Sequence, residues 1–258
     1  MTLHVEETGK PEAPSIVFMH GIGASGWMWY PQIAALSNYH CMNVDLPGHG
    51  KSNQVEWVSF ADVADQVAAL IRERATSGRA HVVGLSLGGY VVLVLLERHP
   101  DVVDRAIISG VTAEPMPNRW LLKPQLWLTT ALFRREGYVK RLAKSLAPNA
   151  QAAFIENLRA MSMEAYRRIY EEAAEFHVPQ ALRSSNTPTL ITAGGRESRI
   201  IIEAVEAISK LMPQGQGRLA PGMGHGWNLE APDLFSAMIR AWINNAPLPG
   251  GLRPIDNR

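Results

Sequence analysis

The sequence has a single cysteine, Cys41, among its 258 residues, so an internal disulfide is impossible. A chain without a disulfide framework gives no sign of an oxidising compartment. The longest apolar run covers residues 90–96, far short of the ~20 residues that a membrane-spanning helix needs. The N-terminus also lacks the basic-then-apolar order of a secretory signal. We therefore expect a cytoplasmic protein that has no contact with a membrane.

An excess of charge of one sign is missing as well. The chain carries 25 basic and 24 acidic residues, a net charge of +1 at pH 7. This balance offers no basis for binding nucleic acid or an anionic membrane surface. The sequence contains neither a cluster of cysteines and histidines nor the zinc-binding pattern H-E-x-x-H, which argues against a zinc hydrolase. We therefore expect no metal.

What the chain does have is an alternation of two hydrophobic patterns. Hydrophobic residues make up 47% of it, enough for a sizeable core. Helical patterns, such as residues 59–78, separate short apolar runs that are rich in β-branched residues. Near-continuous apolar strands separated by helices predict an α/β fold, with a mostly parallel central sheet covered by helices on both faces. The predicted strands lie at 15–20, 41–45, 80–86, 105–110, 187–195 and 217–221.

The alternation stops in the middle of the chain. Residues 112–186 contain several segments with helical spacing and no convincing strand. Strand patterns resume at residue 187. We therefore predict one core domain formed by residues 1–111 and 187–258, interrupted by a helical cap of residues 112–186.

Ser86 stands at the junction of a predicted strand and a predicted helix. Gly84-Leu85-Ser86-Leu87-Gly88 matches the pattern G-x-S-x-G in the strand–turn–helix setting that this pattern requires. A sharp turn there tolerates only small neighbours, and the helix N-terminus directs free N–H groups to the same place. Such a turn presents the hydroxyl as a nucleophile. The alternative is an ordinary glycine turn with an incidental serine.

The loop after the first predicted strand, residues 20–23, reads His-Gly-Ile-Gly. A loop of this kind offers a backbone N–H to a developing oxyanion, so we predict the amides of Ile22 and Leu87 as the two donors. We expect His20 to shape the loop through hydrogen bonds to neighbouring backbone rather than to act in catalysis. The alternative for these glycines is a loop that cradles a phosphate group, although the P-loop pattern G-x-x-x-x-G-K-[ST] is absent.

Two later loops contain histidines. "DLPGHGKS", residues 45–52, follows a predicted strand, and we expect its His49 to stabilise the turn. "GMGHGWNLEAP", residues 222–232, places His225 among glycines between a short strand and the last helix. That setting lets an imidazole reach Ser86 as a general base, in the chain order Ser, acid, His of one hydrolase class.

Taken together, these four motifs resemble the α/β-hydrolase fold family, in particular its capped esterases, lactonases and carbon–carbon-bond hydrolases. The resemblance implies a helical cap inserted after the sixth strand, Ser86 as nucleophile, His225 as base and no cofactor. Family members commonly carry an aspartate shortly after the strand that corresponds to residues 187–195. Here Glu197 stands at that place, and we assign it as the triad acid. Glu114, which follows an earlier strand, is the alternative.

The serine also narrows the chemistry that the resemblance implies. Haloalkane dehalogenases and epoxide hydrolases of this fold attack through an aspartate, so Ser86 argues against both. We predict a serine carboxylesterase that cleaves small apolar esters through an acyl-enzyme, or a lactonase or carbon–carbon-bond hydrolase with the same triad. A ligand-binding receptor that keeps the fold without catalysis is the alternative from another class. The predicted partner is a small-molecule ester, bound by a monomer or homodimer.

Most apolar residues of the predicted cap should pack it against itself and against the core. A minority should line an apolar pocket over Ser86, suited to acyl or aryl groups of modest size. The predicted walls of this pocket are Trp120 and Trp127 from the cap, Trp29 beside the oxyanion loop and Trp227 beside the base.

Overall fold

The computed structural model of the protein describes residues 2–117, 122–133, 135–146 and 149–255. Eight strands form one sheet: β1 (Val5–Gly9), β2 (Ser15–Met19), β3 (His40–Val44), β4 (Ala80–Leu85), β5 (Val103–Ser109), β6 (Thr189–Gly194), β7 (Gly215–Ala220) and β8 (Arg253–Pro254). Their spatial order is β1-β3-β2-β4-β5-β6-β7-β8. The neighbours from β3 to β7 pair in parallel, whereas β1 and β8 pair antiparallel at the two edges. The prediction of a mostly parallel sheet is confirmed.

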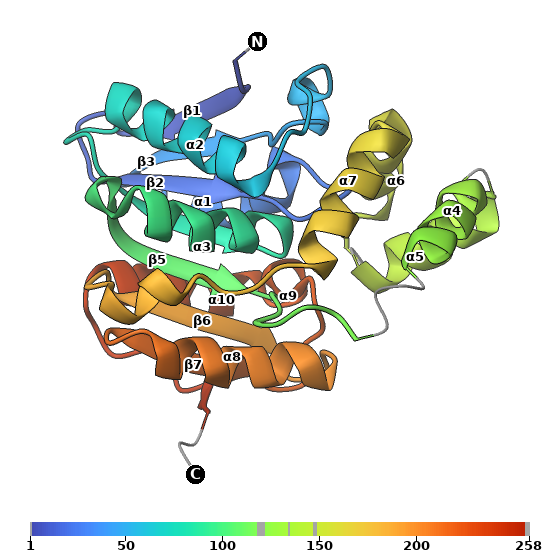
Figure 1. Ribbon diagram of the computed structural model, residues 1–258. Helices are drawn as coiled ribbons and strands as arrows, with labels where there is room; N and C mark the ends of the chain where they lie inside the picture. The colour runs from blue at the N-terminus through green and yellow to red at the C-terminus, as the bar shows by residue number, and fades with distance from the viewer. Residues whose placement is uncertain (1, 118–121, 134, 147–148, 256–258) are drawn as a thin grey trace.

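Helices cover both faces of the sheet (Figure 1). One face carries α2 (Phe60–Arg74), α3 (Leu87–Arg98) and α8 (Arg199–Leu211), and the other carries α1 (Tyr30–Ala35) and α10 (Pro232–Ile243). A short helix, α9 (Trp227–Glu230), directly precedes α10. Because both faces are covered, the central strands are excluded from water, and β2 and β3 are buried along their whole length.

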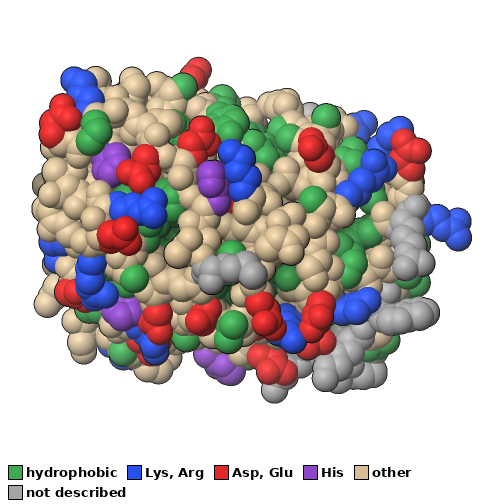
Figure 2. Space-filling view, turned by 90° about the horizontal axis from the view of Figure 1, so that it is seen from above, with side chains coloured by type: hydrophobic (Ala, Val, Ile, Leu, Met, Phe, Trp, Pro, Cys, Tyr) green, Lys and Arg blue, Asp and Glu red, His purple; other side chains and the backbone are tan. Residues whose placement is uncertain are grey.

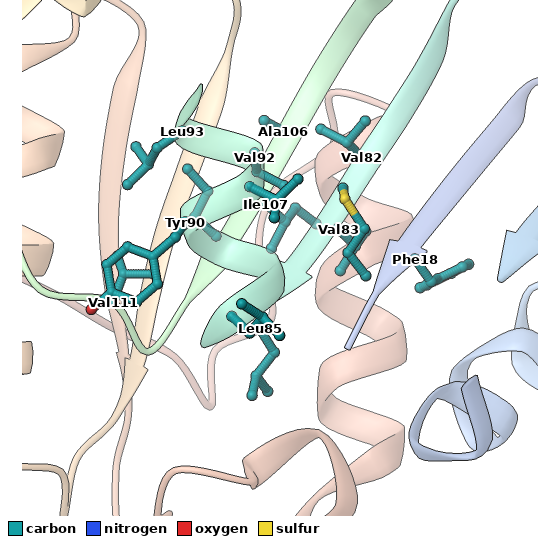
Figure 3. Close-up of a cluster of buried hydrophobic side chains, with 14 of the residues drawn as sticks. Phe18, Val82, Val83, Leu85, Tyr90, Val92, Leu93, Ala106, Ile107 and Val111 are labelled. Atoms are coloured by element: carbon teal, nitrogen blue, oxygen red, sulfur yellow. The ribbon is translucent and has the colours of Figure 1, made fainter. Parts of the chain in front are cut away.

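The sheet ends that face the insertion are fixed by a tightly packed helix. Residues 87–96 of α3 are all buried, because β4 and β5 cover one side of this helix and α2 packs beside it. Burial of apolar surface contributes about 25 cal/mol per Å² to the stability of the fold. The packing of α3 therefore stabilises this helix and the turn that precedes it. Figure 3 shows part of this cluster, with Tyr90, Val92 and Leu93 of α3 near Val82, Val83 and Leu85 of β4 and Ala106 and Ile107 of β5.

Four helices lie between β5 and β6: α4 (Leu122–Leu132), α5 (Glu136–Leu146), α6 (Gln151–Ala160) and α7 (Met163–Ala174). They sit to one side of the sheet, beyond the strand ends toward which β5 points (Figure 1). The helical insertion therefore follows the fifth strand along this chain, one strand earlier than the resemblance implies.

The two ends of the insertion are joined to each other by backbone hydrogen bonds, which form a neck. The N–H of Met116 donates to the carbonyl of Ala174 (2.9 Å). The N–H of Val178 donates to the carbonyl of Ala113 (3.1 Å). The chain therefore leaves the core and returns to it at nearly the same place.

The surface carries charges of both signs. On the face shown in Figure 2, basic and acidic side chains of the described residues are interspersed, and neither sign gathers in one continuous patch. Across the described ranges, no helix is both long enough and apolar enough to span a bilayer.

Candidate active site

Ser86 occupies the turn between β4 and α3, with φ +55° and ψ −112°. A positive φ is uncommon for a residue with a side chain, and such strain costs roughly 1–3 kcal/mol. The Ser86 N–H donates to the carbonyl of Ser109 (2.7 Å), which holds the turn. A Cβ on Gly84 would overlap the carbonyl of Gly88, and a Cβ on Gly88 would overlap the carbonyl of Met19. The flanking glycines are therefore required by sterics, as the G-x-S-x-G pattern predicts.

His225 and Glu197 lie side by side, although 28 residues separate them in sequence. The His225 Nδ1 is 2.5 Å from Glu197 Oε2, and Glu197 Oε1 accepts a hydrogen bond from the Gly194 N–H (3.2 Å). The Glu197 side chain is 2% exposed and the imidazole 28%. When Nδ1–H donates to the carboxylate, Nε2 keeps a lone pair for an incoming proton. Glu114 is exposed, and no hydrogen bond within the described ranges joins it to His225.

Two small cavities with mainly apolar walls meet at Ser86 and His225. Both are lined by these two residues together with Ile22 and Tyr170. The smaller cavity, of about 100 Å³, extends toward Ala24, Trp27, Met28, Phe154 and Leu229. The larger cavity, of about 180 Å³, extends toward Tyr90, Thr112, Met116, Ile169, Ala173 and Ile201. The hydroxyl and the imidazole that the sequence singles out are therefore brought to one place.

The two predicted oxyanion donors lie at the same place. Ile22 and Leu87 both line the larger cavity with Ser86. Leu87 is the first residue of α3, where backbone N–H groups have no partner within the helix. Among the residues that the structure describes, neither amide donates a hydrogen bond to a protein acceptor. Both are available to a negative charge that develops beside Ser86.

His20 and His49 are buried and act on the backbone around them. The Leu46 N–H donates to His20 Nε2 (2.9 Å), so Nδ1 of His20 carries the proton and donates to the Gly21 carbonyl (2.8 Å). His49 Nδ1 lies 2.9 Å from the Pro47 carbonyl. Burial lowers the pKa of His20 to about 4 and that of His49 to about 3. Both imidazoles are neutral at pH 7 and shape their loops, as expected.

Gly21, Gly23 and Gly26 also match G-x-G-x-x-G, a pattern found in dinucleotide-binding turns. Those turns open a helix whose N-terminus faces the pyrophosphate. Here the glycines lead into a short 3-10 helix and then the six-residue α1. The side chains of Phe154 and Leu158, both in α6, lie 3.4 Å from the position that a Cβ on Gly23 would take. The loop is covered by apolar side chains and does not fit a phosphate group.

The predicted tryptophan walls are wrong where the structure describes them. Trp29 is fully buried, with its ring against those of Phe18 and Phe235. Trp227 is also fully buried, and its Nε1 donates to Ser109 Oγ (2.9 Å). Both rings belong to the core behind the site and line neither cavity beside Ser86. Trp120 and the side chain of Trp127 lie outside the described residues.

The walls come instead from residues that the sequence pattern did not single out. The insertion supplies wall residues to the cavities that include Phe154 of α6, and Ile169 and Tyr170 of α7. Trp27 and Met28 follow the oxyanion loop. Their helical or turn spacing gives no signal of which side chains face Ser86, because that depends on how the insertion docks.

The described residues do not gather three or more His, Cys, Asp or Glu side chains in a group that would hold a metal ion. The thiol of Cys41 is buried in β3, and burial raises its pKa to about 12. It is therefore a poor nucleophile at neutral pH. The chemistry that this geometry supports is attack by the Ser86 hydroxyl with the imidazole as proton acceptor.

Comparisons with known proteins identify the family of the chain. A model of the alpha/beta hydrolase family matches residues 16–238. The chain is 30% identical over 262 residues to an AB hydrolase superfamily protein of Gibberella zeae, which covers 95% of this chain and 86% of that protein. It is 26% identical over 253 residues to carboxylesterase YbfK of Bacillus subtilis, which covers 93% and 83%. The solved structure of a thermophilic esterase from Thermogutta terrifontis matches it with a TM-score of 0.80 at 22% identity, over 94% of this chain and 93% of the other. The chain belongs to the alpha/beta hydrolase family.

Proposed function

We propose that this hydrolase is a serine carboxylesterase that cleaves small apolar esters through an acyl-enzyme. One observation carries the proposal: Ser86, in a strained turn, lines the same cavities as His225, whose Nδ1 is bound to Glu197. A hydroxyl, an imidazole and a carboxylate in this order form the nucleophile, base and orienting acid of acyl transfer.

In the first half of the reaction, Ser86 Oγ attacks the ester carbonyl while His225 Nε2 takes the hydroxyl proton. The negative charge that develops on the carbonyl oxygen is stabilised by the N–H groups of Ile22 and Leu87. His225 then gives its proton to the leaving alcohol as the C–O bond breaks. Glu197 holds the imidazole in the required tautomer and stabilises its charged form.

In the second half, water attacks the acyl-enzyme. His225 takes a proton from that water. When the second tetrahedral intermediate collapses, the bond between the carbonyl carbon and Ser86 Oγ breaks, His225 returns its proton to Oγ, and the carboxylic acid leaves. The protein groups return to their starting protonation states, so the cycle needs no further reactant.

The size of the cavities supports a small substrate. Volumes of about 100 and 180 Å³ lie below the 300–1,000 Å³ that is typical of pockets for drug-sized ligands. Apolar side chains from α6 and α7 form part of the walls, so we propose that the helical insertion acts as a cap that selects the substrate. The carboxylesterase and esterase names of two similar proteins are consistent with this choice.

The test is hydrolysis of p-nitrophenyl acetate and butyrate by the wild type and Ser86→Ala. We expect kcat to fall by about 10³-fold or more in the variant. Ser77→Ala removes an exposed hydroxyl far from the cavities and is the matched control, expected to keep full activity. Undiminished turnover by Ser86→Ala would show that another group is the nucleophile.

A further inference from the structure

Glu230, the last residue of α9, bridges the two loops that carry His225 and Glu197. Its Oε1 accepts a hydrogen bond from the Gly224 N–H (3.0 Å), and its Oε2 pairs with Arg196 Nη2 (2.7 Å). Gly224 directly precedes His225, and Arg196 directly precedes Glu197. One carboxylate therefore contacts the neighbour of each member of the imidazole–carboxylate pair.

The two loops are also packed closely on each other. The Arg196 N–H donates to the carbonyl of Met223 (2.9 Å). A Cβ on Gly194 would overlap the carbonyl of Gly224, and a Cβ on Gly224 would lie 2.7 Å from Glu230 Oε1. Glycine at 224 is therefore what lets the carboxylate approach the backbone that positions the imidazole.

The two contacts of Glu230 differ in how strongly they can restrain the loops. The Glu230 side chain is 15% exposed, whereas that of Arg196 is 63% exposed. An exposed ion pair contributes little, because water and salt screen it. A hydrogen bond from a backbone N–H to a charged and partly buried carboxylate is stronger than a bond between two neutral groups. The bond to Gly224 is the one expected to restrain the loop.

We propose that Glu230 is a positioning residue that holds the loop of His225 against Glu197, so that the Nδ1–H bond to the carboxylate persists. Its effect on ester cleavage rests on the proposed function. Its effect on the bond between His225 and Glu197 does not, because that bond joins two side chains of the protein itself.

The kinetic test compares Glu230→Ala, Glu230→Gln and Asp233→Ala. Glu230→Ala should lower kcat by roughly 10-fold to 100-fold with little change in KM, because a misplaced catalytic group affects the transition state more than binding. Glu230→Gln keeps an oxygen acceptor for the Gly224 N–H and should recover most of kcat. Asp233→Ala removes an exposed carboxylate from the adjacent helix and should match the wild type. An unchanged kcat in Glu230→Ala would overturn the proposal.

A readout that needs no turnover is the downfield proton NMR resonance of a hydrogen-bonded imidazole Nδ1–H, assigned by its absence in His225→Gln. We expect it to be lost or broadened in Glu230→Ala and kept in Glu230→Gln and Asp233→Ala. Its persistence in folded Glu230→Ala would overturn the proposal whatever the kinetics. Full turnover by Ser86→Ala would instead overturn the proposed function and leave this readout valid.

Circular dichroism checks that each variant folds. If Glu230→Ala does not fold, Gly224→Ala takes its place, because its added methyl displaces the carboxylate while keeping its charge. This variant should also lose the resonance, and its persistence there would equally overturn the proposal.

Discussion

Gly110 stands against the imidazole of His225: a Cβ on this glycine would lie 2.8 Å from the ring Cε1 and 3.0 Å from Nδ1. Gly110 follows β5 with a φ of +70°, and its N–H donates to the carbonyl of Thr192 in β6 (3.1 Å). The space that the imidazole occupies therefore depends on a residue without a side chain, in a segment that the G-x-S-x-G and His motifs do not include.

Gly110→Ala should displace the imidazole from its place beside Glu197. Because a shift of about 1 Å in a reacting group costs up to 10²-fold in rate, we expect kcat for p-nitrophenyl butyrate to fall by roughly that factor. The positive φ should add a loss of about 1–3 kcal/mol in the free energy of unfolding. Gly250→Ala, where nothing lies within 4 Å of the added methyl, is the control. Equal kcat values for Gly110→Ala and the wild type would contradict this account.

The acid can be tested by exchanging its charge for an amide. Glu197→Gln keeps the shape of the side chain but stabilises the wrong imidazole tautomer, so kcat should drop by about 10⁴-fold. Glu114→Gln, at the exposed alternative position, should leave kcat unchanged. Steady-state kinetics of the two variants with p-nitrophenyl acetate decide between them, and the reverse outcome would make Glu114 the acid.

Trp27 limits the smaller cavity. It lines this cavity on one side and, on the other, a groove of about 400 Å³ that Tyr30, Glu156 and Asn157 also line. Phe154 of α6 faces the cavity, while Asn157, one turn later, faces the groove. The indole therefore lies at the boundary between the two spaces.

Trp27→Ala should join the cavity to the groove and relax the limit on substrate length. Each added methylene that becomes buried contributes about 0.8 kcal/mol to binding. The ratio of kcat/KM for an ester with an eight-carbon acyl or alcohol group to kcat/KM for the four-carbon ester should therefore be at least about 10-fold higher in the variant than in the wild type. Two ester series, varied in the acyl group or in the alcohol, show which group occupies the cavity. Tyr30→Ala enlarges only the groove and should not change the preference. Unchanged ratios in both series would mean that Trp27 is not the limit.

The buried histidines make stability depend on pH. Burial lowers the pKa of His49 from its ordinary value of 6.5 to about 3, so the unfolded chain binds a proton that the folded chain does not. The contribution of His49 to the free energy of unfolding should therefore be complete above pH 6.5 and should be lost progressively as the pH drops toward 3. His20, with its pKa lowered to about 4, acts in the same direction.

His49→Gln offers an N–H to the Pro47 carbonyl without titrating. Between pH 6 and 4, the free energy of unfolding of this variant should fall less steeply than that of the wild type. The two slopes should differ by about 1.4 kcal/mol per pH unit. Urea unfolding at a series of pH values measures this slope. His177→Gln, at an exposed site, serves as the control and should run parallel to the wild type. If the His49→Gln curve is parallel as well, His49 is not the source of the slope.

Much of the fold follows from segments that are apolar throughout or have a clear period. The helix predicted at 59–78 is α2, Phe60–Arg74, and its Ser59 side chain accepts a hydrogen bond from the Asp62 N–H (3.1 Å) at the helix start. The edge strands β1 and β8 escaped prediction because each is largely exposed, and β1 contains mostly polar residues. Such strands are defined by a neighbour rather than by their own pattern.

At the candidate site, too, some features could be predicted from the sequence and others could not. Ser86, His225 and Glu197 follow parallel strands, whose carboxyl ends meet at one edge of the sheet, so their convergence was predictable. The direction of a side chain was not. Trp29 and Trp227 are near the motifs in sequence, yet both rings point into the core, where they pack on Phe235.

The neck formed by the Met116–Ala174 and Ala113–Val178 backbone hydrogen bonds has an evolutionary consequence, because it joins the two ends of the insertion where the chain leaves the core and returns to it. The entropy of closing a loop grows only slowly with its length, so helices of other number and size can be spliced in beyond these bonds at little thermodynamic cost. The register between β5 and β6 would not change. Recombination at this junction would therefore change the substrates that a descendant protein accepts, while its reaction chemistry stays the same.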